Sequence, residues 1–433
     1  MNRIVLIGNG FDLAHGLKTS YQDFIRWYWE QIIDELCKLE TPTYKNELGE
    51  ITCRTFRTWS LYWEHKKRVD GPIDPEEFLS DILYGVDSFE QHLEPFFENI
   101  CEQVGTIGWV DVEYEYYQQL KKLILHSTNP QFSKVQAVKK LNAQLVFIQK
   151  RLIDFLNTKS IPQTPNERLK KILYEPIMES EVAVSRMADF YDHVDAWLCA
   201  DNLSWELRYD RYDIQQWQIN NSVRQSQIKD IKQDVENMHL DEKDGQKERV
   251  KLALKHNRLL ETQWPDDILF VNFNYTSVAE LYVNPYKFQY VTIHGNLSEP
   301  ESIVFGYGDD VDNEYKEIQS QNENVFMDCF KTNMYMERDN YRKVLQFAES
   351  EPYQVYIIGL SCGTSDRTLL HTLFEHSNCV SIKPFFYRKS DGSDTFRELQ
   401  MNIARNFTDS KKMRERVVNK VNTTTYSDDR EQK

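Results

Sequence analysis

The chain has no long apolar run, no excess of positive charge and no dinucleotide fingerprint of the GxGxxG type, and each absence narrows its class. No window approaches the roughly 20 apolar residues that a spanning helix needs, and the apolar run at the N-terminus is too short for a signal-peptide core. The formal net charge of −16 disfavours general binding to a nucleic-acid backbone. We therefore expect a soluble, cytoplasmic protein, and neither membrane nor nucleic acid as a partner.

The cysteines are few and dispersed. The seven of them include no CxxC pair and no zinc-like grouping with histidine. This usage is typical of reduced, mostly buried thiols in an intracellular protein, so we expect no resident metal. The 433 residues are 40% hydrophobic and 13% aromatic, which is enough for a large buried core.

A strand buried on both faces is predicted at the N-terminus, where the aliphatic run RIVLI (residues 3–7) is ended by a glycine. Comparable runs follow only after residue 260. They lie at residues 267–273, 288–294, 302–308, 354–361 and 380–388. The sheet must therefore be assembled from distant parts of the chain.

The long stretch between these strands shows helical patterns. In residues 133–156, apolar side chains recur at spacings of three and four and predict one buried stripe: Val138, Leu141, Leu145, Ile148, Leu152 and Leu156. Residues 211–262 are predicted to form two helices with a break at 241–249. Residues 70–78 (DGPIDPEEF) are typical of a loop that leads into a helix start.

The simplest architecture is a doubly wound, mostly parallel α/β sheet of the Rossmann type with a large all-α insertion after the first strand. Residues 1–30 and 263–407 would form one discontinuous domain. Residues 31–262 would form the helical insertion, and residues 408–433 a polar, frayed tail.

Polar or glycine-rich turns follow several of these strands, and ligands of open parallel sheets bind at that edge. The first turn, residues 8–10 (GNG), serves either a tight strand-to-helix connection or a phosphate. The second carries Asn272, Asn274 and Thr276, which suit hydrogen bonds to a sugar, although these residue types also cap helices.

Two further turns complete the set. His294 follows a strand and precedes Gly295, a setting that the other nine histidines lack, so it is either structural or an acid–base group. Residues 359–366 (GLSCGTSD) place small hydroxyl residues and free amides before a helix, where they form an anion site unless Asp366 is only a cap. Four such turns are hard to explain by packing alone.

Together these segments resemble the AbiH family of bacterial phage abortive-infection proteins. The resemblance rests on IGNGFDLAHGLKTSYQDF, VNFNYTSV, IHGNL and IIGLSCGTSD, and covers the first 24 residues and residues 268–370. A looser similarity connects the same order of turns to the sirtuin-like Rossmann domain. Asn9 replaces the alanine of the sirtuin turn, Thr276 replaces a more usual aspartate, and the absence of a four-cysteine zinc module argues against a protein deacylase.

The resemblance implies an NAD site, with NAD as substrate or ligand and no cofactor required. Gly8, Asn9, Gly10 and Asp12 would line the ligand, and the amides of the glycine turn would hold its diphosphate. Asn274 would hold the ribose or a water and His294 would be the acid–base residue. Further ligand contacts would come from Asn272, Thr276, Gly359, Ser361 and Asp366.

The reaction that the resemblance implies is hydrolysis of NAD to nicotinamide and ADP-ribose, triggered by phage infection. Such an activity would poison its own cell, so we expect the insertion to cover the site or to mediate homo-oligomer assembly until a phage-derived trigger acts. The aromatic segments 57–67 and 109–120 favour this, although they could equally form the core of the insertion.

Two alternatives stay open. The first is a non-catalytic nucleotide sensor that signals to a partner defence protein, because a fold does not fix a function. The second is a nuclease that binds Mg²⁺ through Asp309, Asp310 and Asp312 on a surface loop.

Overall fold

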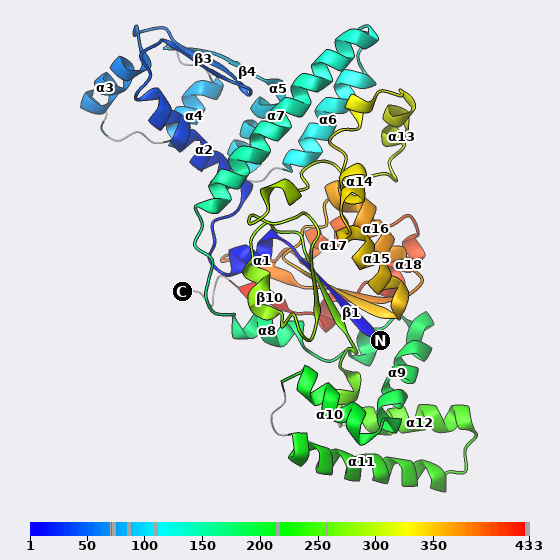
Figure 1. The fold of residues 1–433 in the computed structure, drawn as a ribbon. Helices are drawn as coiled ribbons and strands as arrows, with labels where there is room; N and C mark the ends of the chain where they lie inside the picture. The colour runs from blue at the N-terminus through cyan, green and yellow to red at the C-terminus, as the bar shows by residue number, and fades with distance from the viewer. Residues whose placement is uncertain are drawn as a thin grey trace.

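A parallel sheet of five strands forms the centre of the molecule (Figure 1). The computed structural model describes residues 1–69, 71, 75–84, 88–107, 111–213, 217–255 and 259–428. The sheet has the order β6-β5-β1-β7-β8, and all of its neighbouring strands run parallel. Its strands are β1 (Asn2–Ile7), β5 (Ile268–Asn272), β6 (Gln289–Thr292), β7 (Tyr353–Ile358) and β8 (Cys379–Pro384).

The strand order confirms an open parallel sheet built from distant segments. Numbered along the chain within this sheet, the order is 3-2-1-4-5, as in the first five strands of doubly wound dinucleotide-binding sheets. From β1 the chain adds β5 and β6 on one side, and then returns to add β7 and β8 on the other side. The direction of winding therefore reverses between β1 and β7. Ile7 at the end of β1 pairs with Asn272 on one side and with Ile358 on the other, so the three strands end at the same level.

Alternate side chains of the strands fill two apolar layers. Ile4 and Leu6 face one layer and Val5 and Ile7 the other, as the two-residue period of a strand requires. The first layer is covered by α15 (Asn340–Ser350), α16 (Arg367–Glu375) and α17 (Phe396–Arg405). The second is covered by α1 (Asn9–Ala14) and α8 (Glu167–Leu173). Helices therefore cover both faces of the sheet.

Above the carboxyl ends of the strands lies a lobe formed by residues 21–157, here called the upper lobe (Figure 1). Its helices are α2 (Tyr21–Leu36), α3 (Trp59–Val69), α4 (Pro75–Tyr84), α5 (Pro95–Ile107), α6 (Val112–Ile124) and α7 (Gln131–Asn157). The apolar stripe predicted for residues 133–156 is confirmed, since all six of its side chains are buried in this lobe.

The upper lobe also contains an antiparallel sheet, so the prediction of an all-α insertion is wrong. Its strands are β2 (Thr43–Asn46), β3 (Gly49–Cys53) and β4 (Phe89–Leu93), in the order β2-β3-β4. These strands are short and mostly polar, which hid them from the apolar patterns. The aromatic side chains Trp59, Trp63 and Tyr116 lie in the lobe's own core, as the alternative reading of segments 57–67 and 109–120 supposed. Residues 109 and 110 lie outside the described ranges.

A second lobe, residues 187–254, lies at the opposite end of the sheet and is here called the lower lobe. It contains α9 (Met187–Cys199), α10 (Asn202–Arg211), α11 (Trp217–Asn237) and α12 (Glu242–Leu254). The two helices predicted in this stretch are present as α11 and α12, but the break between them lies at 238–241 and not at 241–249. Asp241 caps α12 through the backbone amide of Asp244, and the glycine at 245 lies inside the helix. The predicted insertion therefore consists of two lobes joined through α8.

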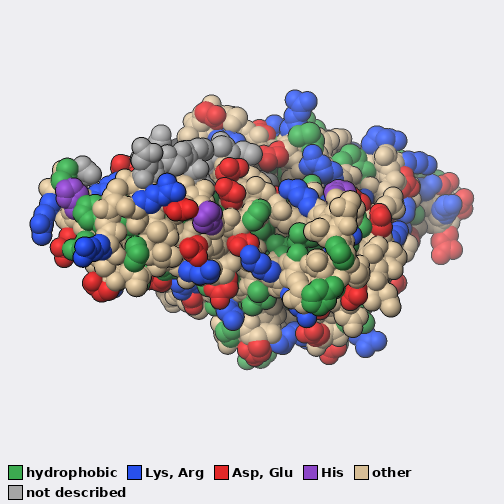
Figure 2. Space-filling model, turned by 90° about the horizontal axis from the view of Figure 1, so that it is seen from above, with side chains coloured by type: hydrophobic (Ala, Val, Ile, Leu, Met, Phe, Trp, Pro, Cys, Tyr) green, Lys and Arg blue, Asp and Glu red, His purple; other side chains and the backbone are tan. Residues whose placement is uncertain are grey.

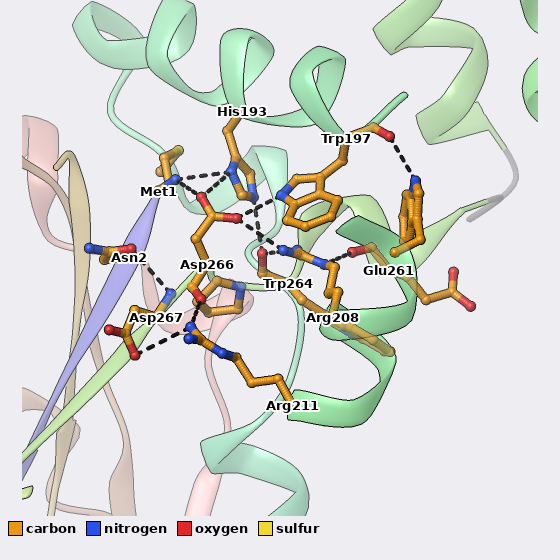
Figure 3. A network of polar contacts seen from close by, with 12 residues as sticks. Met1, Asn2, His193, Trp197, Arg208, Arg211, Glu261, Trp264, Asp266 and Asp267 are labelled. Atoms are coloured by element: carbon orange, nitrogen blue, oxygen red, sulfur yellow. Dashed lines mark hydrogen bonds and ion pairs between the residues drawn. The ribbon is translucent and has the colours of Figure 1, made fainter. Parts of the chain in front are cut away.

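An ionic network anchors the lower lobe to the sheet (Figure 3). The carboxylate of Asp266 accepts hydrogen bonds from Trp197 Nε1 at 2.6 Å and Arg208 Nη1 at 3.0 Å, and it pairs with the amino group of Met1 at 2.6 Å. His193 Nδ1 lies 3.1 Å from the same carboxylate. One carboxylate thus ties α9 and α10 to the starts of β1 and β5.

The C-terminal region differs from its prediction. Residues up to 428 are not a frayed tail: α18 (Ser410–Arg416) packs against β8, and β10 (Thr425–Asp428) pairs with β9 (Phe386–Arg388). The helix start expected after residues 70–78 is present at Pro75, while residues 70 and 72–74 lie outside the described ranges.

The strand predicted at residues 302–308 is absent; only Tyr307 makes an isolated bridge, to Phe330. This segment is apolar because it lies between the upper lobe and the sheet. The remaining helices are α13 (Asn313–Ser320) and α14 (Lys331–Met334).

The surface of the described residues offers two general observations. Across the face in Figure 2, Lys and Arg side chains are interspersed with Asp and Glu, so this face presents no continuous basic surface. None of the helices in the described ranges combines the length and the apolar character that a membrane span requires.

Candidate functional site at the carboxyl ends of the strands

A cavity of about 320 Å³ lies between the carboxyl ends of the strands and the upper lobe. It is at the point where the winding of the sheet changes direction, which is where open α/β sheets bind ligands. Most of the predicted site residues line it: Gly8, Asn9, Gly10, Asp12, Asn274, Thr276, His294, Gly359, Ser361 and Asp366. Four separate turns therefore converge on one cavity.

Asn274 is held rigidly in this cavity. Its side-chain amide donates to the carbonyl of Gly8 at 3.1 Å and to Asp12 Oδ1 at 3.0 Å, and its backbone N–H donates to Asn272 Oδ1 at 3.1 Å. Its own Oδ1 has no hydrogen-bond partner in the described part of the chain. Asn274 is thus a fixed acceptor beside the cavity rather than a helix cap.

Asp12 braces this arrangement from the start of α1. Its second oxygen accepts a hydrogen bond from Thr276 Oγ1 at 2.5 Å. Burial raises the pKa of Asp12 to about 6, and the hydrogen bonds from Thr276 and Asn274 oppose that rise. The carboxyl group therefore changes its charge near neutral pH.

Asn272 supports the site without lining it. Its side-chain amide donates to the carbonyl of Thr276 and to Tyr290 Oη, both at 3.0 Å, and the residue is fully buried. We therefore place Asn272 behind Asn274 as a brace, not as a ligand contact.

Two of the three amides in the glycine turn, those of Gly8 and Gly10, are bonded within the protein. The N–H of Gly8 donates to the carbonyl of Ile358 at 3.1 Å, and that of Gly10 to the carbonyl of Gly359 at 2.8 Å. A Cβ on Gly8 would lie 2.5 Å from the Cα of Leu360. These two glycines allow two strand ends to touch, and no backbone bond from the N–H of Asn9 is found in the described ranges, so a diphosphate contact through this turn stays a prediction.

His294 lies in the cavity wall with both ring nitrogens engaged. Its Nε2 is 3.1 Å from Asp366 Oδ1 and 3.1 Å from Tyr335 Oη, and the ring also hydrogen-bonds the backbone of Phe273. Burial lowers the pKa of His294, and the charge of Lys331 lowers it further. The imidazole is therefore neutral at physiological pH.

Behind the cavity, one lysine joins two carboxylates from opposite sides of the site. Lys331 is completely buried, and its Nζ lies 2.7 Å from Asp366 Oδ1 and 2.8 Å from Glu113 Oε2. Glu113 Oε1 accepts the backbone N–H of Gly306 at 2.9 Å. Because Glu113 belongs to α6, this chain of contacts joins the upper lobe to the sheet.

The pKa values of Glu113, Asp366 and Lys331 are shifted in different ways by burial and by one another. Burial raises the pKa of Glu113 to about 8, although Lys331 opposes the rise. Burial also acts to raise the pKa of Asp366, but Lys331 and His294 outweigh it and hold that pKa below its usual range. The pKa of Lys331 is raised by Asp366 and Glu113 against the effect of burial. Of the two carboxyl groups that contact Lys331, Asp366 is therefore the more readily ionised, and Glu113 is the one that holds its proton to higher pH.

The upper lobe supplies part of the cavity wall. Asp111, Glu113, Leu152 and Leu156 line it from α6, α7 and the turn before α6, and Asp111 Oδ2 accepts a hydrogen bond from Ser365 Oγ at 3.0 Å. Glu113, Asp111 and Lys331 were absent from the sequence-based site. No local pattern distinguishes them, because only the docking of the lobe brings them together.

The aspartates considered for a nuclease are used structurally. Asp309 is 3% exposed and pairs with Arg367 at 3.2 Å, contrary to the surface position expected for it. Asp312 caps α13 and accepts a hydrogen bond from Tyr117. In the described ranges, no group of three His, Cys, Asp or Glu side chains is placed to hold a metal ion.

Fold and cavity together define an open parallel α/β protein with a polar site at its change of winding. A family model described as bacteriophage abortive infection AbiH matches residues 4–388. The chain belongs to the AbiH family, which places it among the proteins of bacteriophage abortive infection. Neither a curated protein nor a solved structure matches it.

Proposed function

We propose that the chain is an anti-phage effector that binds NAD in a sirtuin-like manner and hydrolyses it to nicotinamide and ADP-ribose when infection provides a trigger. The observation that carries the proposal is the fixation of Asn274. Both N–H groups of its amide are spent on the protein, so its Oδ1 is left to orient a ribose hydroxyl or a water molecule.

The charge of the cavity indicates which part of NAD it would take. Its described lining includes the carboxyl groups of Asp12, Asp111, Glu113 and Asp366, and no lysine or arginine. Lys331 offsets the charge of Asp366 and Glu113 from behind the wall. The two acids that form no ion pair in the described ranges, Asp12 and Asp111, are therefore the groups that disfavour phosphate and favour a cation. The oxidised nicotinamide ring is cationic, and so is the ribose as the ring departs, so this half of NAD suits the cavity.

The size of the cavity points the same way. About 320 Å³ is at the lower end of the roughly 300–1,000 Å³ that drug-sized ligands occupy, and NAD contains two nucleosides. A second pocket of about 190 Å³ lies across the turn at Gly359, Leu360 and Ser361, which line both spaces. We assign the adenosine half to this second pocket, whose wall includes Phe385 and Tyr426.

The proposed step needs little proton transfer. The bond between nicotinamide and the ribose breaks, its electron pair leaves with the ring as neutral nicotinamide, and the oxygen of water bonds to the ribose carbon while its proton passes to a base. Asp12, with a pKa of about 6, is suited to accept that proton, because each of its oxygens accepts one hydrogen bond and keeps a second lone pair. His294 would act together with Asp366, because its ring nitrogens already have partners.

One observation favours a second candidate, the nucleotide sensor. A buried histidine with both nitrogens engaged can be a purely structural group, in which case the cavity would bind NAD without turning it over. In that case the upper lobe, which forms one wall of the cavity, would carry the signal to a partner.

The test compares nicotinamide release by the purified full chain with release by Asn274→Ala. Asn378→Ala is the matched control, because its side-chain amide also donates two hydrogen bonds, in this case both to backbone carbonyls, but lies just before β8, at the other end of the sheet. We expect loss of turnover in the first variant only. If the wild-type chain binds NAD but releases no nicotinamide, even with phage lysate added, the sensor replaces the hydrolase.

A further inference from the structure

The contact between α6 and the segments that follow the strands of the sheet includes specific polar and aromatic pairs. Along one helix, Asp111 pairs with Ser365, Glu113 with Lys331, and Lys121 with Glu314 at 2.7 Å. Tyr117 stacks on Tyr307 with ring centroids 4.0 Å apart. The upper lobe is therefore docked in one defined position, and the contact at Glu113 is the one that continues into the cavity.

We propose that Glu113 is a positioning residue, which shares Lys331 with Asp366 and so couples docking of the upper lobe to the charge beside His294. The proposal rests on the proposed function only in taking this cavity as the reaction site. Its physical basis is an excess of acid, since three carboxyl groups surround one buried ammonium.

The groups that face Glu113 come from every element packed against it. They are Asp111 before α6, Tyr21 of α2, Tyr275 after β5, Lys331 of α14, Tyr335 after α14 and Asp366 before α16. Lys331 is the one cation in this set. With a single positive charge, the site cannot hold all three carboxylates ionised at low energy.

The consequence for His294 follows from the geometry. While Glu113 is protonated, Lys331 serves mainly Asp366, and the imidazole next to that pair stays neutral. When Glu113 loses its proton it competes for Lys331, and Asp366 then acts more strongly on His294. Withdrawal of the lobe removes Glu113 from Lys331, so His294 responds to the titration of Glu113 only while the lobe is docked.

The coupling can be measured without enzymatic activity. In the full chain with ¹³C-labelled histidine, the ring signal of His294 is assigned by its loss in His294→Gln and followed from pH 5 to 10. We expect a step near pH 8 in the wild type, where Glu113 titrates. The step should vanish in Glu113→Gln.

Glu115→Gln is the matched control. Glu115 lies on the same helix and is also buried, but it is bonded inside the lobe by Asn99, Gln103 and Gln119. This variant should keep the step. A step that persists in Glu113→Gln, or a wild type without one, would overturn the proposal.

A further variant and a further readout complete the test. If Glu113→Gln does not fold, Glu113→Asp replaces it: the shorter side chain cannot span Lys331 and the amide of Gly306, so an unchanged step would refute the coupling. NAD hydrolysis is measured in the same samples, and above pH 8 its kcat should fall in the wild type but not in Glu113→Gln, with KM unchanged. If the His294 signal shows the step but no NAD is hydrolysed, this inference holds and the hydrolase proposal fails. If NAD is hydrolysed but the signal shows no step, the hydrolase proposal holds and this inference fails.

Discussion

Two ionic networks, one at each end of the sheet, contain the same local contact. His193 lies 3.1 Å from Asp266, and His294 lies 3.1 Å from Asp366. At the amino ends of the strands, several donors converge on one carboxylate (Figure 3). At the carboxyl ends, several carboxyl groups share one lysine beside a cavity.

The comparison teaches that a histidine beside an aspartate does not by itself mark a reaction site. Where cations match or exceed the carboxylate, the pKa of the acid falls, as it does for Asp266 under His193, the Met1 amino group and Arg208, and the network is an anchor. Where carboxyl groups exceed cations, their pKa values separate, which provides a proton near neutral pH.

Lys331→Met should have the largest effect on stability. It leaves two buried carboxyl groups without a cation and should cost about 3–5 kcal/mol of the free energy of unfolding at pH 8. Without the lysine, the pKa of each acid in the folded state rises above its unfolded value, so stability falls as pH increases. Urea titrations at pH 5 and pH 8 check this, and an equal loss at both values would contradict it.

Asp266→Ala should come second. It leaves the guanidinium of Arg208, whose side chain is 2% exposed, without its carboxylate. Because Asp266 itself is 38% exposed, we expect the free energy of unfolding to fall by about 2–4 kcal/mol, less than for a fully buried pair. The loss should vary little above pH 5, because Asp266 of the wild type is ionised there and the guanidinium of Arg208 keeps its charge. If the loss of stability in Asp266→Ala depended on pH in the same way as the loss in Lys331→Met, the difference between the two networks in their balance of acids and cations would be contradicted.

The features predicted from sequence are those that one segment encodes alone. The runs that became β1, β5, β6, β7 and β8 are rich in aliphatic, β-branched or aromatic residues. Parallel strands place their carboxyl ends together, so the convergence of Asn274, His294 and Asp366 followed from the strands themselves. The roles proposed for these residues remain predictions.

The features that were missed depend on contacts between distant segments. Glu113 and Glu115 look alike in VEYEYYQQL, and only the docked lobe turns one toward Lys331 and the other into the helices. Residues 302–308 have the composition of a strand because they are buried, but the amide of Gly306 is taken by Glu113 instead of a neighbouring strand. Sequence periodicity reports burial and not the partner that causes it.

Glu113→Gln should stabilise the protein at alkaline pH. The pKa of Glu113 rises from 4.5 to about 8 on folding, so between these values the folded chain binds the extra proton and loses stability as pH increases. The amide removes this loss. We expect the free energy of unfolding to increase by about 1–3 kcal/mol at pH 8.5, which corresponds to a shift of about one to two pKa units. At pH 4 we expect no increase. Thermal unfolding across this range decides it, with Glu115→Gln as the unchanged reference.

The matched pair His193→Gln and His294→Gln should have the smallest effect on stability and the clearest effect on function. Each histidine is buried with its pKa lowered, so the unfolded state binds more protons near pH 6 and each contributes stability that is lost as the pH falls below about 6.5. Each replacement should cost about 1 kcal/mol at pH 7.5, one buried hydrogen bond.

Binding and turnover of NAD then separate the two histidines, since only His294 lies in the cavity wall. If His193→Gln lowered turnover as much as His294→Gln at equal stability, the surplus of carboxyl groups would no longer support the network at the cavity as the proposed reaction site. The anchor of the lower lobe would then have to be treated as part of it.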